Sequence, residues 1–247
     1  MSAFSVASVL GIPIGLGVAD VWGWETTFAY IVGLGLLIFF LSWKIFPSLK
    51  DHIRDVHPIE TLKHYGQIMT TPRYLFSHLF MFIVATSMFL LIPFLSPYAV
   101  KNIGIAKEEL KIMYLVGGAF TVFTARLFGI LTDRWGATRI FWGGALLAII
   151  PVLLYTHAGP MGLVAYLAMS TLFMVLVSGR MIPCMTLLSS VPRMKDRGGF
   201  MGLLNSTRAL GSASSTLLAG YMISESAQGQ LHHFDRVGYL SVTLIFV

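Results

Sequence analysis

Three arginines stand inside long apolar segments of the sequence, where a charge needs a specific reason. Arg126, Arg180 and Arg208 each interrupt a segment that otherwise holds no acidic or basic residue. A charge at the centre of a lipid bilayer costs about 2.5–3.5 kcal/mol on insertion scales. Such a guanidinium can bind an anion in a cavity, hydrogen-bond to a neighbouring helix, or extend to the lipid headgroups.

The three arginines differ in their distance from the charged ends of their segments. Arg126 is about two helical turns from Arg134, which favours extension of its side chain to the headgroups. Arg180 and Arg208 lie farther from basic neighbours, so a cavity or structural role and extension to the headgroups both stay open. No acidic residue occurs within 134–195. The partner of Arg180 must therefore be a backbone carbonyl, a residue on another helix or a substrate.

A second charged group follows one of these segments, and we call it the 129–139 motif. It places Gly129, Asp133, Arg134, Gly136 and Arg139 where one apolar segment ends and the next begins. The glycines permit a tight turn and close helix contact. The carboxylate can accept hydrogen bonds from a helix N-terminus, and the arginines can pair with acids on a facing helix. The motif predicts a contact that opens and closes; a plain basic loop is the alternative.

Other chemistry has little support in the sequence. An intramembrane hydrolase would need a Ser–His pair or two aspartates inside the apolar segments, which hold no central Asp. The spacing of His52, His57 and His64 does not match the pattern that helical metal ligands favour, and no Cys lies near them. We therefore expect no metal, no cofactor and no enzymatic activity.

The composition requires lipid as the solvent for most of the chain. Hydrophobic residues make up 56% of the 247 residues and charged residues only 11%, and the mean hydropathy is +0.78. Soluble domains are about 45–50% apolar and about 25% charged. These values exclude a soluble enzyme, a disordered chain and a nucleic-acid-binding module, although the net charge is +6. The single Cys184 excludes a disulfide within the chain.

The apolar segments predict seven membrane-spanning helices and a shorter eighth. A spanning helix needs about 20 mostly apolar residues, and the segments lack the alternation of a membrane β-barrel. A Gly-Pro break at residues 156–160 divides the longest segment into a hairpin. The expected spans are Ser2–Ala19, Thr26–Trp43, Tyr74–Val100, Ile112–Thr132, two within 140–188, and Gly198–Ile223, followed by the apolar stub Val237–Val247.

Basic residues collect on alternate loops, which fixes the expected orientation. Ten lysines and arginines fall in the 44–73 loop, the turn after Thr132 and the loop at 189–197, against four in the other loops. Positively charged loops stay in the cytoplasm. We therefore expect the N-terminus in the cytoplasm. Within the 44–73 loop, apolar residues at three-residue steps from Ile59 to Ile68 predict a short amphipathic helix on the inner membrane surface.

With the spans placed, three segments resemble a known family. The 129–139 motif resembles the G-x-L-x-D-R-x-G-R-K/R signature of the major facilitator superfamily, with Ala137 in place of a basic residue. Ser178–Pro183 and Arg197–Met201 resemble helices ten and eleven of its drug/proton antiporter branch, which includes sugar-efflux permeases. The N-terminal glycines and proline are similar to the fifth-helix motif of that branch, although Glu25 stands where relatives usually carry Arg; they are Gly11, Pro13, Gly15 and Gly17.

The resemblance implies helices five to eleven of that family and the start of helix twelve. The fold class expected is an all-α polytopic bundle, incomplete, with about seven spans and a partial eighth. Residues 1–43 would be the last two helices of the N-terminal bundle, 44–73 the cytoplasmic central loop, and 74–247 a C-terminal six-helix bundle with a truncated last helix. The chain is expected to be a fragment: a truncated gene, or a start codon inside a longer frame.

The function that the resemblance implies is secondary active transport by alternating access. The expected reaction is proton-coupled efflux of a small molecule, such as a drug or a sugar, across the inner (plasma) membrane. The expected partners are the lipid bilayer, the small-molecule substrate and protons, and no nucleic acid. The alternative is a truncated membrane fragment with no transport activity of its own.

Overall fold

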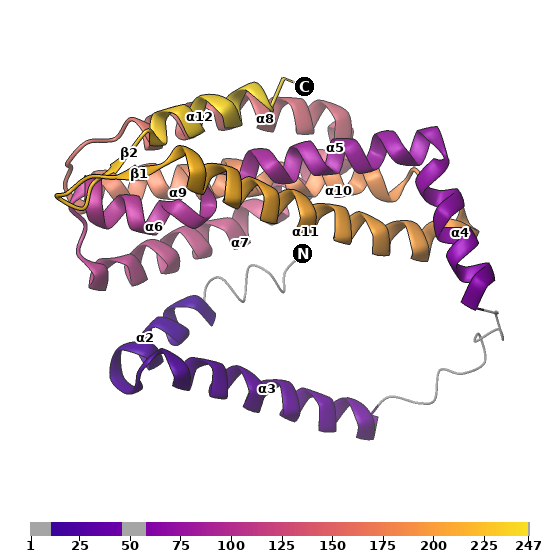
Figure 1. Cartoon of the computed structure of the whole chain (residues 1–247), viewed down its shortest axis with the longest axis horizontal. Helices are drawn as coiled ribbons and strands as arrows, with labels where there is room; N and C mark the ends of the chain where they lie inside the picture. Colours follow the sequence, from indigo (N-terminus) through magenta and orange to yellow (C-terminus); the bar gives the residue numbers. More distant parts are fainter. Residues whose placement is uncertain (1–10, 46–57, 247) are drawn as a thin grey trace.

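The computed structural model describes residues 11–45 and 58–246, and these are almost entirely helical. Figure 1 shows a hairpin of α2 and α3, a short α4 across one end of a bundle, and the bundle itself, formed by α5 to α12. The all-α polytopic bundle expected from the sequence is confirmed. The helices are α2 (Ile12–Trp22), α3 (Trp24–Ile45), α4 (Pro58–Thr70), α5 (Pro72–Phe89), α6 (Leu95–Tyr98), α7 (Leu110–Trp135), α8 (Ala137–Thr156), α9 (Leu163–Gly179), α10 (Met181–Ser189), α11 (Arg197–Met222) and α12 (Phe234–Thr243).

Five helical segments of the described residues are long and apolar enough to cross a membrane. They match five of the expected spans: Trp24–Ile45, Pro72–Ile103, Lys107–Trp135, Ala137–Thr156 and Leu163–Ser189. The hairpin break is confirmed, since α8 ends at Thr156 and α9 begins at Leu163. Helix α11 is long enough at 26 residues, but glycines, serines and an arginine lower its hydropathy. Half of the expected span Ser2–Ala19 lies outside the described residues.

Prolines divide the long segment that begins with α5. Helix α5 ends at Phe89, and a 3-10 turn (Ile92–Phe94), α6 and a π-helical turn (Ala99–Ile103) continue the path. A proline has no N–H and its ring clashes with the carbonyl four residues earlier. Pro93 therefore ends the regular helix at Phe89, and Pro93 and Pro97 already predict from the sequence a break at the outer end of the expected span Tyr74–Val100.

A second proline divides the segment formed by α9 and α10, but not where the sequence suggested. The sequence predicts a span that continues past Arg180 to about Leu188, with an early end near Pro183 as the alternative. The structure places the break four residues earlier, between Gly179 and Met181. The reason is again the missing donor, because Pro183 cannot bond to the carbonyl of Gly179. Arg180 thus sits at the break itself.

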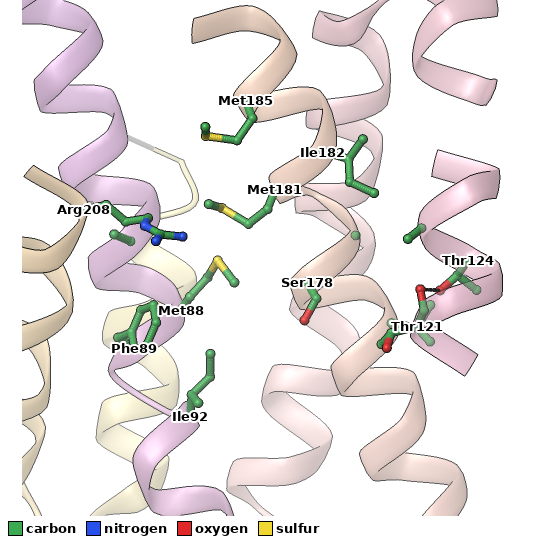
Figure 2. A pocket seen from close by; sticks show the side chains of 14 residues that line it. Met88, Phe89, Ile92, Thr121, Thr124, Ser178, Met181, Ile182, Met185 and Arg208 are labelled. Atoms are coloured by element: carbon green, nitrogen blue, oxygen red, sulfur yellow. Dashed lines mark hydrogen bonds between the residues drawn. The ribbon is translucent and has the colours of Figure 1, made fainter. Parts of the chain in front are cut away.

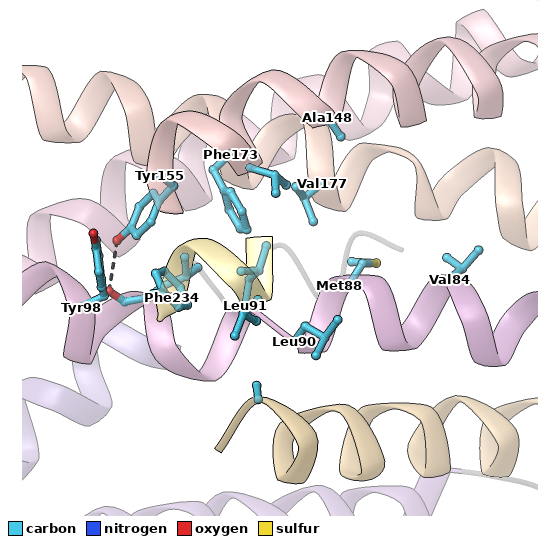
Figure 3. Packing of buried hydrophobic residues seen from close by; sticks show 14 of the residues in the cluster. Val84, Met88, Leu90, Leu91, Tyr98, Ala148, Tyr155, Phe173, Val177 and Phe234 are labelled. Atoms are coloured by element: carbon cyan, nitrogen blue, oxygen red, sulfur yellow. Dashed lines mark hydrogen bonds between the residues drawn. The ribbon is translucent and has the colours of Figure 1, made fainter. Parts of the chain in front are cut away.

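The core of the bundle joins these broken helices to α8 and α12. Figure 3 shows Tyr155 and Phe173 pointing from α8 and α9 towards α5 and α6, with ring centroids 5.6 Å apart. The hydroxyl of Tyr155 donates to the carbonyl of Leu95 at 3.1 Å. Tyr98 packs on Phe234 of α12 at 4.5 Å between ring centroids. These buried rings hold the irregular segment after α5 in place.

One end of the bundle is closed by polar contacts between its loops. Asn102 pairs with the backbone of Leu231 through two hydrogen bonds of 2.9 and 3.0 Å. Lys101 forms a salt bridge of 2.7 Å with Glu225. Leu231 and Glu225 belong to a small antiparallel ribbon of β1 (Ser224–Glu225) and β2 (Leu231–His232). The hydroxyl of Tyr98 also donates to the carbonyl of Ala158 at 2.9 Å, so the three segments 98–103, 156–161 and 224–232 share this end.

The opposite end carries α4 and the start of α11. The hydroxyl of Tyr74 donates to the carboxylate of Asp196 at 3.0 Å and accepts from the backbone N–H of Arg193 at 3.2 Å. His64 on α4 lies 3.6 Å from the same carboxylate. Ile68 of α4 is buried. The helix expected in the 44–73 loop thus exists, and its last turns pack on the bundle. His52 and His57 lie outside the described residues.

The α2–α3 hairpin has a different surface from the bundle. The hydroxyl of Thr27 donates to the carbonyl of Gly15 at 3.2 Å, which joins the two helices. Asp20 forms a salt bridge with Lys111 of α7. No residue of α3 is buried. Because its most apolar 18-residue stretch has a mean hydropathy of 2.0, this helix presents apolar side chains on every side, as a lipid-facing or protein-covered helix does.

Helices α5 and α11 pack closely because Gly211 has no side chain. A Cβ at this position would lie 2.9 Å from the backbone carbonyl oxygen of Phe82. We predict that Gly211→Ala lowers the stability of the purified chain in detergent by about 1–3 kcal/mol, the usual result of overpacking. Thermal unfolding measures this. The control is Gly220→Ala on the same helix, where a Cβ meets nothing within 4 Å; equal effects of both variants would contradict the prediction.

Candidate functional site

A cavity of about 250 Å³ lies between the two broken helical segments of the bundle. Figure 2 shows side chains from α5, α7, α9, α10 and α11 pointing into it. Both proline breaks contribute to its wall, with Phe89 and Ile92 on one side and Gly179 and Met181 on the other. Broken helices in membrane transporters commonly surround the substrate site. The lining residues are Ala85, Met88, Phe89, Ile92, Thr121, Thr124, Ala125, Val175, Ser178, Gly179, Met181, Ile182, Met185 and Arg208.

Arg208 supplies the charge of this cavity. It is the twelfth of the 26 residues of α11, so it lies near the middle of the helix. Figure 2 shows its guanidinium pointing from α11 towards Met181 on α10. Among the described residues, no side chain forms a salt bridge or hydrogen bond with it. The lining set contains no Asp, Glu or His. Of the sequence alternatives for Arg208, the geometry favours the cavity position.

The rest of the wall is mostly apolar and soft. Met88, Met181 and Met185 line the cavity with Phe89 and Ile182. Methionine side chains are flexible and polarizable, so they adapt to ligands of different shape. Three hydroxyl groups provide the remaining polarity: Thr121, Thr124 and Ser178.

Arg180 occupies a different position, behind the break rather than in the main cavity. It is only 2% exposed. Its Nη2 donates to the hydroxyl of Ser87 on α5 at 2.7 Å, and its Nε has no partner among the described residues. It lines a second cavity of about 130 Å³ beside Phe80, Phe141 and Leu244. The partner left open by the sequence is therefore a residue on another helix.

Ser87 links Arg180 to its own helix α5 and to α12. Its hydroxyl donates to the carbonyl of Val84 at 2.8 Å, while its own carbonyl accepts from Ser241 of α12 at 2.6 Å. The two proline breaks are thus connected through one buried arginine and one serine. Sequence reasoning missed Ser87, because a serine in an apolar helix gives no signal of its own.

The 129–139 motif forms the turn between α7 and α8. Gly136 follows the last residue of α7 and has a φ of 87°, a backbone conformation that favours glycine. Asp133, Arg134 and Arg139 are exposed. Among the described residues, these three side chains form no salt bridge or hydrogen bond. Gly129 lies in α7, and a Cβ there would meet nothing within 4 Å. The charged side chains of the motif therefore do not make the predicted contact with any described residue.

The remaining predicted residues lie apart from the cavity. Arg126 is exposed on α7 and is not among the cavity residues. Gly11 and Pro13 stand at the start of α2, where the proline occupies the first turn. Gly15 contacts Thr27, and a Cβ on Gly17 would meet nothing within 4 Å. Asp196 was not among the predicted site residues, yet it is buried and hydrogen-bonded to Tyr74.

Comparison with known sequences identifies the family. The sequence model of the Major Facilitator Superfamily matches residues 1–216, which is most of the chain. The chain belongs to the Major Facilitator Superfamily. This confirms the resemblance that the 129–139 motif carried, and it agrees with the multi-pass helices of the structure. The family match and the five long apolar helices together show a multi-pass membrane protein.

A curated relative within the family is similar over part of its length. It is a protein of Helicobacter pylori (strain P12) described as a "Probable sugar efflux transporter". The two share 26% identity over 150 residues, which is 61% of this chain and 37% of the relative. The match therefore spans little more than a third of the length of that superfamily member.

The hydrogen bond between Arg180 and Ser87 should affect the stability of the folded chain but not its insertion into the membrane. We predict that Ser87→Ala destabilises the purified chain by about 1.5–3 kcal/mol, because it removes the acceptor of a buried guanidinium. Arg180→Lys keeps the charge but loses the planar fork, and Arg180→Ala removes both. We expect normal insertion for all three and, in a full-length frame that transports, impaired transport for the two Arg180 variants, more severely for alanine.

Thermal unfolding in detergent and membrane abundance measure these effects. Ser214→Ala is the control, because that exposed serine bonds only to carbonyls of its own helix. A Ser87→Ala chain as stable as the Ser214→Ala chain would show that the bond contributes little. Unchanged transport by Arg180→Ala would assign its side chain a purely passive role.

Proposed function

We propose that this chain is part of a secondary active transporter that exports a small molecule by alternating access. The observation that carries the proposal is the cavity between two proline-broken helices, with a cation near the middle of α11. Residues 74–247 would form the C-terminal bundle, 1–43 the last helices of the N-terminal bundle, and 44–73 the connection between them. The cavity would be the half of the substrate site that the C-terminal bundle contributes.

The breaks in the helices support movement around the cavity. A helix interrupted by proline bends more easily at the break than a continuous one. Here both breaks line the cavity, so bending of either would change its width. The 129–139 motif would act at the cytoplasmic end, with Asp133 accepting hydrogen bonds in one state and losing them in the other. On this proposal, the exposed side chains of the motif would represent the state without that contact.

We further propose an orientation of the chain in the membrane and an energy source for export. The loops with many basic residues would face the cytoplasm, and the protein would lie in the inner (plasma) membrane. In agreement, α4 and the start of α11 lie together at the end of the bundle opposite the 98–103 segment. Export would be driven by protons moving inward. The proton site would lie outside the cavity lining described here, since that lining holds no carboxylate or imidazole.

Everted membrane vesicles test transport directly. In vesicles with an acidified lumen, an exporter that exchanges protons accumulates substrate inside. We expect accumulation of at least one labelled compound from a panel of sugars, dyes and organic acids, and loss of it when a protonophore is added. Vesicles without the protein are the control. The assay uses the 247-residue chain and any longer frame that contains it; no accumulation by either would support a membrane protein without transport activity.

Asp133 provides a second test of the same proposal. We predict that Asp133→Asn reduces transport several-fold while membrane abundance stays unchanged, because the exposed carboxylate is not needed for insertion. The expected shift in the conformational equilibrium is about 1–3 kcal/mol. Trp135→Phe, a change at an exposed neutral position of the same turn, is the control. Equal transport by wild type and Asp133→Asn at equal abundance would remove the gating role.

A further inference from the structure

We infer that the cavity selects an amphipathic organic anion, with an apolar body and a carboxylate or similar group that binds Arg208. This inference rests on the proposed transport function and names its substrate class. It differs from a cationic drug and from a neutral sugar, the substrate in the printed name of the curated relative. Charge, the apolar wall and the state of the hydroxyl groups each support it.

The charge of the cavity is positive and uncompensated. Arg208 points into the space, and the lining set contains no acidic residue. Among the described residues, its guanidinium has no hydrogen-bond or salt-bridge partner. The sequence predicts that α11 spans the membrane, and near the middle of such a helix a cation without a partner is costly unless water or an anion reaches it. A cationic substrate would be repelled here, whereas a carboxylate would form a charge-assisted, bidentate pair.

The wall opposite the guanidinium fits an apolar body. Met181 and Met185 of α10 face it across the cavity, and Met88, Phe89 and Ile92 continue the apolar surface. A ligand with its charge at one end can place that charge on Arg208 and its hydrocarbon on the methionines. Pockets for small molecules have this form, with many apolar side chains and few polar groups that fix orientation.

The hydroxyl groups are poorly placed for a sugar. Thr121 donates to the carbonyl of Gly118 at 2.7 Å, and Thr124 donates to that of Phe120 at 2.8 Å. Their donor capacity is therefore used inside α7. Only Ser178 has no such bond among the described residues. A sugar buries many hydroxyl groups that each need a partner, and this wall offers few.

A matched series of probes tests the substrate class by binding alone. The probes are 2-naphthoate, its neutral amide 2-naphthamide and the cation 2-naphthylmethylamine, with lactose as the neutral sugar. The purified chain is placed in nanodiscs of zwitterionic lipid, and binding is measured by calorimetry. We expect naphthoate to bind most tightly. Tighter binding of the cation or of lactose would overturn the inference.

Substitutions at Arg208 separate the charge from general hydrophobic binding. Arg208→Gln should weaken naphthoate binding by about tenfold or more, as the loss of a charge-assisted bond requires, and leave naphthamide unchanged. Arg208→Lys should retain part of the affinity. The matched control is Arg126→Gln, which removes an arginine that lies outside the cavity. Equal naphthoate binding by wild type and Arg208→Gln would overturn the inference, and Arg208→Lys applies the same test if the glutamine variant is unstable.

Two further measurements distinguish the outcomes. An anionic phospholipid has the same chemistry as the expected ligand, so the measurement is repeated in nanodiscs that contain phosphatidylglycerol. Retained naphthoate binding supports a soluble anion, while its abolition assigns the site to lipid and overturns the inference. Binding can be measured without transport. Arg208-dependent binding without accumulation in vesicles would therefore contradict the proposed function and leave the inference standing. If a sugar accumulates and Arg208→Gln does not change that accumulation, the inference is contradicted and the proposed function stands.

Discussion

The hydrogen bond between Arg180 and Ser87 connects the two breaks on which the arrangement of the bundle depends. A buried guanidinium needs an acceptor, and the acidic residues of the chain lie far from it in sequence. Arg180 stands at the break between α9 and α10, where its Nη2 donates to the hydroxyl of Ser87 on α5 at 2.7 Å. Because Ser87 also accepts from Ser241 at its carbonyl, α5, α12 and the α9–α10 segment are held by one polar group in an otherwise apolar interior.

The same two breaks explain why the cavity lies where it does. Pro93 and Pro183 each remove a helical hydrogen bond, so α5 and α9 end within the bundle instead of crossing it regularly. Residues at both ends, Phe89 and Ile92 on one side and Gly179 and Met181 on the other, line the cavity. Arg208 enters this space from α11. Its position near the middle of that helix is acceptable because the cavity gives it access to water or an anion.

Contacts at the two ends hold the bundle around this centre. The Tyr74–Asp196 bond joins the start of α5 to the start of α11, and Gly211 brings the same two helices close along their length. At the other end, Asn102 bonds to the backbone of Leu231. The cavity side of the bundle is thus wide between α5 and α10 and tight between α5 and α11. A ligand in the cavity would contact the methionines of α10 and the charge of Arg208 on α11.

The sequence alone determined the solvent, the helical class and the family, because apolar runs of about 20 residues and the 129–139 motif are local patterns. It also placed the hairpin break and the irregular segment after α5, since proline acts on its own backbone. It could not choose between the roles of Arg180 and Arg208. Both stand in apolar helices, and only packing shows that Arg180 turns to Ser87 while Arg208 faces the cavity. The tertiary structure decided this because a side chain's partner on another helix depends on how the helices pack, which no spacing within one helix records.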